Sequence, residues 1–101
     1  MKVQQFYNKN QFIITDGAKK VFQSYDSTIA KIDANGVLTL GEDWNYSNTT
    51  RKHFYLFLND YKNDINAEQY KNIFSKGFET CKNKAQFIEN LIKRKIIKVS
   101  L

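Results

Sequence analysis

The hydrophobic and polar residues alternate with a period of two in the first forty residues and with a helical period after that. Short alternating runs between turn residues predict strands in the first part. Asp16-Gly17 and Asn35-Gly36 are the strongest turn signals, because glycine adopts a positive φ at little steric cost. The five expected strands are Val3–Tyr7, Gln11–Thr15, Lys19–Tyr25, Thr28–Asp33 and Val37–Leu40.

In the second half, apolar residues recur three and four positions apart, which predicts helices over 49–62, 67–76 and 84–94. Side chains that can cap a helix precede each segment. They are Ser47, Asn48 or Thr49 for the first helix, Asn66 with Gln69 for the second, and Asn83 for the third. Gly77 is placed to end the second helix. Residues 96–101 are expected to form a last short strand or a docked tail.

Strands followed by helices predict an α+β fold: an antiparallel β-meander of four to five strands packed against two to three C-terminal helices. A chain of 101 residues fits a single domain over residues 1–101. The apolar positions that share a face give the expected core. It comprises Phe12, Ile14, Ile32, Leu38, Leu40, Phe54, Phe57, Leu58, Phe74, Ile88 and Leu91.

The formal net charge is +6, and all of the excess lies after residue 50. Such asymmetry favours an acidic partner, either nucleic acid, a nucleotide or an acidic protein surface. A solvated lysine-rich surface is the alternative. No segment approaches the ~20 apolar residues that span a bilayer, and the polar N-terminus does not resemble a signal peptide. We therefore expect a cytoplasmic protein, and the lone Cys81 suits that compartment.

Catalytic and metal-binding motifs are missing from the sequence. Cys81 is the only cysteine and His53 the only histidine, which argues against a transition-metal site and against a nucleophile activated by a base. The sequence has no glycine-rich phosphate loop. We therefore expect a protein that is not an enzyme and has no cofactor.

Three neighbouring segments carry a resemblance to known proteins. They are Ser24 to Asp33, Gly36 to Gly41, and Asp43-Trp44-Asn45-Tyr46-Ser47-Asn48-Thr49-Thr50-Arg51-Lys52-His53. This block resembles short uncharacterised proteins of bacteriophages and mobile elements of low-GC Gram-positive bacteria, over the first 60 residues or so. The resemblance implies a context and no mechanism. Small proteins from that context often regulate or inhibit host machinery, including CRISPR–Cas nucleases.

The first candidate site is the start of the helix near residue 49, with Thr49, Thr50, Arg51 and Lys52. Unpaired backbone N–H groups at a helix start favour an anion. The two cations lie where the helix dipole favours negative charge, at a cost of up to ~1 kcal/mol that a bound phosphate or carboxylate would reverse. Alternatively, Arg51 pairs with Glu42 or Asp43 and nothing binds.

Two further candidates follow from aromatic and basic residues. Trp44 and Tyr46 lie in the loop before the helix and could stack on a base or anchor a protein partner. The alternative is that the loop folds down and Trp44 covers one end of the core. The other candidate is a basic run that could contact phosphates, or could instead complement a helix dipole and aid solubility. It consists of Lys93, Arg94, Lys95 and Lys98.

The leading hypothesis is an accessory protein that binds and inhibits host defence machinery, most specifically a CRISPR–Cas effector. Its partner would be a host protein or a protein–nucleic acid complex. A nucleic-acid-binding accessory protein is the alternative, followed by a binder of an anionic nucleotide at the start of the residue-49 helix.

Overall fold

The first forty residues form strands and helices follow them, which is the order that the hydrophobic pattern predicts. The computed structural model describes residues 2–71, 73 and 76–100, without the side chains of residues 8, 76 and 79. The strands are β1 (Lys2–Phe6), β2 (Asn8–Asp16), β3 (Lys19–Ser24), β4 (Ser27–Ile32), β5 (Leu38–Leu40) and β6 (Lys98–Val99). The helices are η1 (Glu42–Asn45), α1 (Asn48–Asp60), η2 (Lys62–Asp64), α2 (Lys76–Thr80) and α3 (Lys84–Lys93), where η1 and η2 are 3₁₀ turns.

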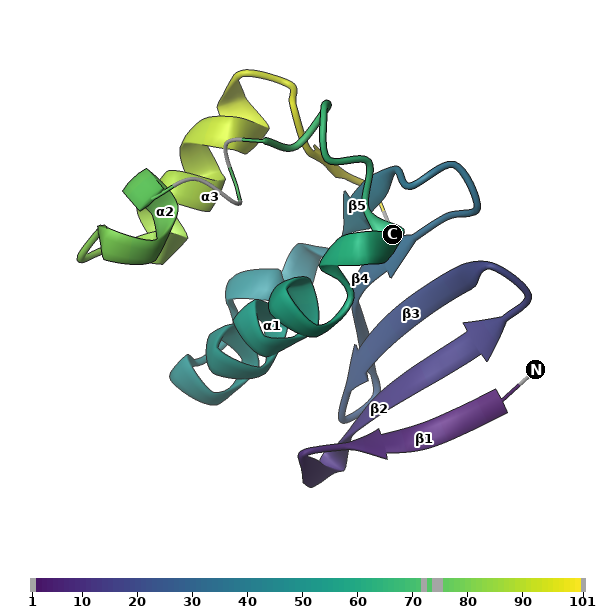
Figure 1. The fold of residues 1–101 in the computed structure, drawn as a ribbon. Coiled ribbons are helices and arrows are strands. Elements are labelled where there is room, and N and C mark those ends of the chain that lie inside the picture. The colour runs from purple at the N-terminus through teal and green to yellow at the C-terminus, as the bar shows by residue number, and fades with distance from the viewer. Residues whose placement is uncertain (1, 72, 74–75, 101) are drawn as a thin grey trace.

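The strands form one sheet in the order β1-β2-β3-β4-β5-β6. The pairs from β1 to β5 are antiparallel, so the predicted meander is confirmed, and β6 joins β5 in parallel. The helices lie on one side of this sheet (Figure 1). The fold is therefore α+β. Within the described residues, no helix has the length and apolar character needed to cross a membrane.

The inner face of β4 and β5 follows the predicted alternation. Ala30, Ile32, Leu38 and Leu40 are all fully buried, and the β4–β5 register pairs Ala30 with Leu40 and Ile32 with Leu38. Residues two apart in a strand point to the same face, so these four side chains form one layer beneath the helices. A bulge in the β3–β4 pairing also brings Ile29 into the core.

The predicted inner face of β2 is wrong. Phe12 and Ile14 are only half-buried, whereas Ile13 is 1% exposed. Three consecutive apolar residues give no alternation, so they cannot decide which face is inner, and a shift of one residue reverses every side chain. The partner strand decides it: Ile13 is paired with Phe22, which is fully buried.

Helix α1 supplies the apolar stripe that the sequence predicts. Phe54, Phe57 and Leu58 are buried, and the Phe57 ring stacks on Phe22 with the ring centroids 5.6 Å apart. In α3 the buried residues include Ile88 and Leu91, as expected. Asn83 caps α3, because its Oδ1 accepts a 3.0 Å hydrogen bond from the backbone N–H of Gln86.

The helix predicted over 67–76 is wrong. Residues 67–71 form turns, and the helical segment α2 begins only at Lys76. The expected cap exists, since Asn66 Oδ1 accepts from the N–H groups of Glu68 and Gln69, but no helix follows it. Gly77, expected beyond the helix end, lies inside α2. The predicted core residue Phe74 lies outside the described residues.

The C-terminal segment returns to the sheet. Ile97 is 1% exposed, and β6 adds two residues beside β5. Ser100 continues the contact by donating its N–H to Leu40 O at 3.1 Å. Of the two expectations for residues 96–101, the short strand is confirmed.

Candidate functional site

The start of α1 is fixed by Ser47. This residue is extended, with φ −151°, and its Oγ accepts a 3.1 Å hydrogen bond from the N–H of Thr50. The Ser47 hydroxyl also donates to Thr50 Oγ1 at 3.1 Å, and Thr50 is only 3% exposed. Ser47 is thus the cap among the three candidates. Thr50 belongs to the end of the core, while Thr49 is exposed.

Arg51 is bound by uncharged partners. Its Nη1 donates a 2.6 Å hydrogen bond to Asn45 Oδ1, and its Nη2 donates to Asn48 Oδ1. Among the described residues, Arg51 therefore forms no ion pair with Glu42 or Asp43, which was the alternative. The Asp43 carboxylate instead accepts a hydrogen bond from the Ser27 hydroxyl. The side-chain amides of Asn45 and Asn48 orient the guanidinium group but do not neutralise its charge. The positive charge of Arg51 remains available to a partner.

Lys52 and Arg51 lie on a groove between α1 and the start of α3. Three hollows of about 550, 310 and 230 Å³ adjoin one another, since all three are lined by Tyr55 and Lys84, and together we call them the α1–α3 groove. Its lining includes five cations and no Asp or Glu among the described residues. These cations are Arg51, Lys52, Lys62, Lys82 and Lys84.

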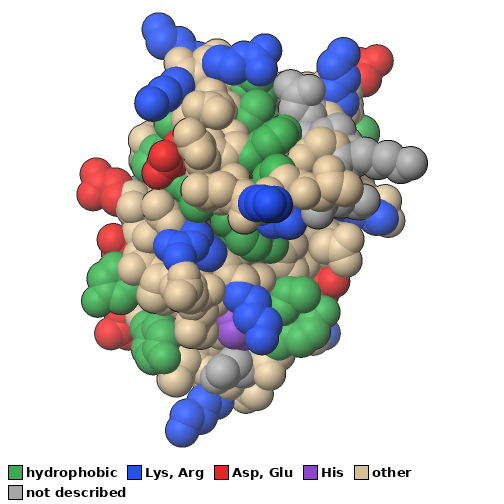
Figure 2. Space-filling view, turned by 90° about the vertical axis from the view of Figure 1, so that its left-hand side faces the viewer, with side chains coloured by type: hydrophobic (Ala, Val, Ile, Leu, Met, Phe, Trp, Pro, Cys, Tyr) green, Lys and Arg blue, Asp and Glu red, His purple; other side chains and the backbone are tan. Residues whose placement is uncertain are grey.

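Figure 2 shows the side of the molecule on which the helices lie. Lys and Arg side chains surround a central strip of hydrophobic atoms, and most Asp and Glu lie toward the edges of this view (Figure 2). The N-termini of α1 and α3 both reach the groove through Asn48 and Asn83. Their dipoles add positive potential to that of the side chains. The groove is therefore suited to an acidic partner.

Tyr55 is the aromatic residue that all three hollows share. Burial raises the pKa of its phenol, and the nearby Arg51 charge opposes this rise only in part. The phenol consequently stays protonated at neutral pH and can donate a hydrogen bond. The sequence predicted this residue only as part of a helix, although its position four residues after Arg51 places both on one face.

Trp44 is buried and does not present its ring to a partner. It is 6% exposed, and its ring centroid lies 5.9 Å from that of Phe54. Gly41 makes this possible, because a Cβ on it would lie 1.9 Å from Thr28 O, so only glycine lets the loop pass so close to β4. Tyr46 is different, with 79% of its surface exposed.

The basic run at the end of α3 is fully on the surface. Lys93, Arg94, Lys95 and Lys98 are all exposed. Lys93 lies in the last turn of α3, where a cation complements the negative end of the dipole. Lys95 has a positive φ of 61° where the chain turns back toward the sheet. None of the four is among the lining residues of the α1–α3 groove.

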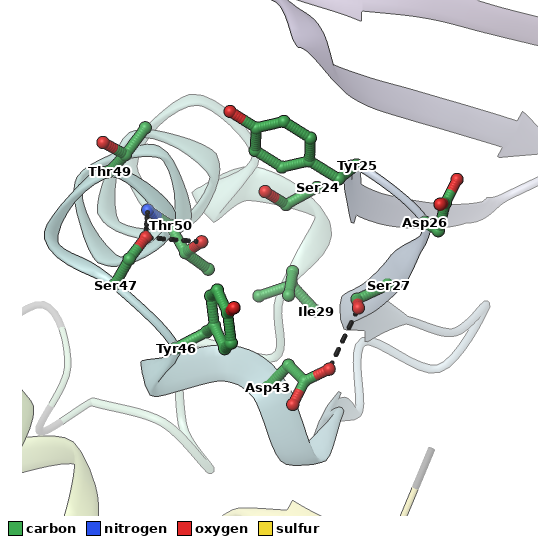
Figure 3. Close-up of a pocket in the computed structure, with 10 residues that line it drawn as sticks. All are labelled: Ser24, Tyr25, Asp26, Ser27, Ile29, Asp43, Tyr46, Ser47, Thr49 and Thr50. Carbon is green, nitrogen blue, oxygen red and sulfur yellow. Dashed lines mark hydrogen bonds between the residues drawn. The ribbon is translucent and has the colours of Figure 1, made fainter.

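A second hollow lies on the sheet side of the α1 start, and we call it the β3–α1 pocket (Figure 3). Its volume is about 540 Å³. Three of its lining residues, Tyr46, Thr49 and Thr50, were predicted from the sequence as binding-site candidates. The other seven were not predicted as binding residues, although Ser47 was named as a helix cap and Asp43 as a possible partner of Arg51. These seven are Ser24, Tyr25, Asp26, Ser27, Ile29, Asp43 and Ser47. One signal could have found the site: Ser24 is polar at an inward position, two residues after the apolar Phe22.

His53, the only histidine, is buried, with 6% of its surface exposed. Its Nδ1 lies 2.8 Å from the backbone oxygen of Thr49, so the ring is held within the first turns of α1. Cys81 is half-buried, and its Sγ lies 3.3 Å from Phe78 O. In the described part of the chain, no three His, Cys, Asp or Glu side chains gather as metal ligands would.

Residues 1–76 match a protein family of unknown function, DUF8033. The match covers most of the chain, so the protein belongs to this family. No curated protein matches the chain, and no solved structure matches it. The β3–α1 pocket lies wholly within the matched residues, whereas the α1–α3 groove also uses Lys82 and Lys84, which follow them.

Proposed function

We propose that the protein is a non-enzymatic accessory protein that acts by binding an acidic partner through the α1–α3 groove. One observation supports this: the described groove lining has five cations and no carboxylate. In the chain as a whole, charged residues of both signs occur, so this separation of charge is local. A groove of one sign raises the concentration of a partner of the opposite sign and speeds association.

The partner that we propose is a host protein or protein–nucleic acid complex of bacterial defence, most specifically a CRISPR–Cas effector in the cytoplasm of the host cell. This finer identity rests on the resemblance of residues 24–53 to phage and mobile-element proteins, while the groove supports only the acidic character of the partner. The groove would cover an acidic protein surface or hold the nucleic acid of the complex. Mimicry of DNA is excluded, since that requires a dense acidic surface.

A plaque assay tests the inhibitor. The protein is expressed in a bacterium with an active CRISPR–Cas effector, and plaque formation by a targeted phage is measured. Inhibition brings plaque numbers to those of a strain without the effector. The variant Lys52→Ala/Lys82→Ala/Lys84→Ala should lose this effect. Normal interference in the presence of stable, expressed wild-type protein, across effectors of several types, contradicts the proposal.

Direct binding of nucleic acid is the second candidate, favoured by the cations around Tyr55. A tyrosine ring can stack on a base while the cations contact phosphates. Binding must then weaken steeply with salt, because association releases counterions. Affinity for single- and double-stranded DNA and RNA is measured at low and physiological salt. No binding at low salt rules out this candidate.

Two triple variants locate the nucleic-acid surface. The groove variant Lys52→Ala/Lys82→Ala/Lys84→Ala and the tail variant Lys93→Ala/Arg94→Ala/Lys95→Ala each remove three cations, so they have equal net charge. A groove interface predicts a larger loss of affinity in the groove variant. An equal loss in both indicates attraction by net charge alone, and a larger loss in the tail variant assigns binding to the end of α3.

A further inference from the structure

The β3–α1 pocket contains a buried polar group without a partner. Ser24 is 3% exposed, and its Oγ has no hydrogen-bond partner among the described residues. Figure 3 shows this hydroxyl pointing into the pocket, toward the start of α1. Buried polar atoms in folded proteins are nearly always hydrogen-bonded, so an unpaired one that borders a cavity indicates a missing partner.

The neighbouring strand has a second example. Gln11 is paired with Ser24 in the β2–β3 register, and it is fully buried with both amide atoms unpaired. Three unpaired polar atoms therefore belong to two residues that are paired across β2 and β3. Residues of this kind weaken the fold, and they are typical of sites where binding takes precedence over stability.

The charge of the pocket is opposite to that of the chain. Its lining contains Asp26 and Asp43 and no Lys, Arg or His, although the net charge of the protein is +6. Asp43 Oδ2 accepts a 2.9 Å hydrogen bond from the Ser27 hydroxyl. That bond orients the carboxylate and leaves its second oxygen without a partner in the described structure. Figure 3 shows the Asp26 carboxylate directed away from the pocket. An anionic ligand would therefore meet the Asp43 carboxylate and no cationic side chain.

Two tyrosines border the opening. Tyr25 and Tyr46 are 58% and 79% exposed, and Figure 3 shows them on opposite sides of the pocket. Tyr25 has a φ of 54°, and its N–H donates a 2.7 Å hydrogen bond to Asn10 O. Aromatic faces attract organic cations, and an aromatic rim with carboxylates is how proteins recognise ammonium groups.

The dipole of α1 acts in the opposite direction but is smaller. Ser47, Thr49 and Thr50 bring the positive end of the helix to the pocket. That end corresponds to about half a unit charge, and Ser47 already accepts hydrogen bonds from the N–H groups of Thr50 and Arg51. The full unit charge of the Asp43 carboxylate outweighs it. The volume of about 540 Å³ is adequate for a small molecule or a long side chain.

We propose that the β3–α1 pocket binds an organic cation with N–H groups, an ammonium or a guanidinium, whose donors meet Asp43 and the buried Ser24 hydroxyl between two tyrosine rings. The cation could be a free amine or the tip of a Lys or Arg side chain on a partner protein. The chemistry is the same for both sources. The site is independent of the α1–α3 groove and has the opposite charge.

The probes are spermidine, arginine amide and a short blocked peptide with one central arginine. Citrulline amide and inorganic phosphate are the controls, because citrulline has the shape of arginine without its charge. Binding is followed through the backbone amide signals of the ¹⁵N-labelled protein. We expect saturable shifts centred on residues 24–29 and 43–50 with the cationic probes only. Tighter binding of spermidine or arginine amide assigns a free amine, and tighter binding of the peptide assigns a protein side chain.

Variants complete the test. Asp43→Asn should weaken binding about tenfold or more, whereas Asp16→Asn, with the same charge change on an exposed residue at the end of β2, should leave it unchanged. Ser24→Ala should weaken binding without lowering the melting temperature. The groove variant should bind as the wild type does, so this proposal and the proposed function can fail separately. Three outcomes would overturn the proposal: no shifts at millimolar probe, equal binding of citrulline amide, or equal effects of Asp16→Asn and Asp43→Asn. The partner of the Ser24 hydroxyl would then be an ordered water molecule.

Discussion

The hydroxyl of Tyr70 contacts both backbone polar groups of Leu38, 32 residues earlier in the chain. It accepts a 3.0 Å hydrogen bond from the Leu38 N–H and lies 3.4 Å from the Leu38 carbonyl oxygen, to which it can donate. Tyr70 is 1% exposed, so both contacts are shielded from water. This side chain fastens the turns after η2 to the sheet beside β5.

Tyr70→Phe should destabilise the protein, because it leaves two buried backbone groups of Leu38 without this partner. An unpaired buried group costs about 1–3 kcal/mol. The free energy of unfolding from urea denaturation measures the loss. Tyr7→Phe is the matched control, since the Tyr7 hydroxyl bonds to Asp60 at 2.6 Å on the exposed surface, where such bonds contribute little. Equal stability of wild type and Tyr70→Phe contradicts the assignment.

The same hydroxyl makes stability depend on alkaline pH. Burial raises the pKa of Tyr70, and the bond to Leu38 opposes this only in part. The unfolded chain therefore ionises this phenol first, near its ordinary pKa of about 10. Below that pH the contribution is complete, and it is lost as the pH rises through the folded-state pKa. Urea denaturation across this range should show a stability difference between wild type and Tyr70→Phe that shrinks as pH increases. A difference that grows with pH contradicts this.

The fold could be predicted from the sequence where a hydrophobic pattern was compatible with only one structure. Ile32, Leu38 and Leu40 each have a polar neighbour in an alternating pattern, and their burial was predicted correctly. Residues 12–14 are all apolar and could not specify a face. Asn66 accepts the hydrogen bonds expected of a helix cap, but turns follow it in place of the expected helix. The tertiary bond from Tyr70 to Leu38 holds these turns, and no local pattern encodes it.

Only those site residues that are neighbours in the sequence could be predicted. The start of α1 was found because a cap and two cations are local signals. Lys82 and Lys84 line the α1–α3 groove with Arg51 only because the folded chain brings them together. In the same way, the fold places Ser24, next to the β3–β4 turn, beside the start of α1. Contacts of that kind do not appear as spacing in a sequence. The burial of Trp44 was left open, because an aromatic residue in a loop is compatible with either a core or a surface position.

Phe57→Ala should cost about 3–5 kcal/mol, since the variant leaves a cavity in a closely packed core. The residue is fully buried, and its ring lies 5.6 Å from Phe22 and 5.2 Å from Tyr61 between centroids. Thermal melts monitored by circular dichroism measure the effect. Val3→Ala, at a position 59% exposed on the edge strand, should melt nearly as the wild type does. An unchanged midpoint for Phe57→Ala would mean that the position is not packed as described.

Trp44→Ala and Tyr46→Ala should differ in stability although they are two residues apart. Trp44 packs on Phe54 within the core, so its loss should cost about 3–5 kcal/mol. Tyr46 is 79% exposed, and its loss should change the free energy of unfolding by less than ~0.5 kcal/mol. Binding defects in Trp44→Ala would therefore reflect unfolding, whereas Tyr46→Ala reports on the pocket rim. Similar stability of the two variants contradicts the burial of Trp44.

Arg51→Glu should leave stability within ~1 kcal/mol of the wild type while weakening the proposed interaction. The substitution removes the hydrogen bonds to Asn45 and Asn48, but a carboxylate in the first turn suits the α1 dipole, and the two effects offset each other. An acidic partner in the α1–α3 groove would then face a negative charge at its centre. Unfolding is measured first, followed by the plaque and nucleic-acid binding assays.

Arg94→Glu is the control for Arg51→Glu, with the same change of charge on an exposed residue outside the groove. A groove interface requires that Arg51→Glu reduce activity or affinity more than Arg94→Glu does. If Arg51→Glu clearly destabilises the protein and leaves activity intact, Arg51 serves only to join η1 to α1 through Asn45. Equal losses in the two variants would instead point to long-range attraction by net charge, because only a local contact distinguishes the two positions.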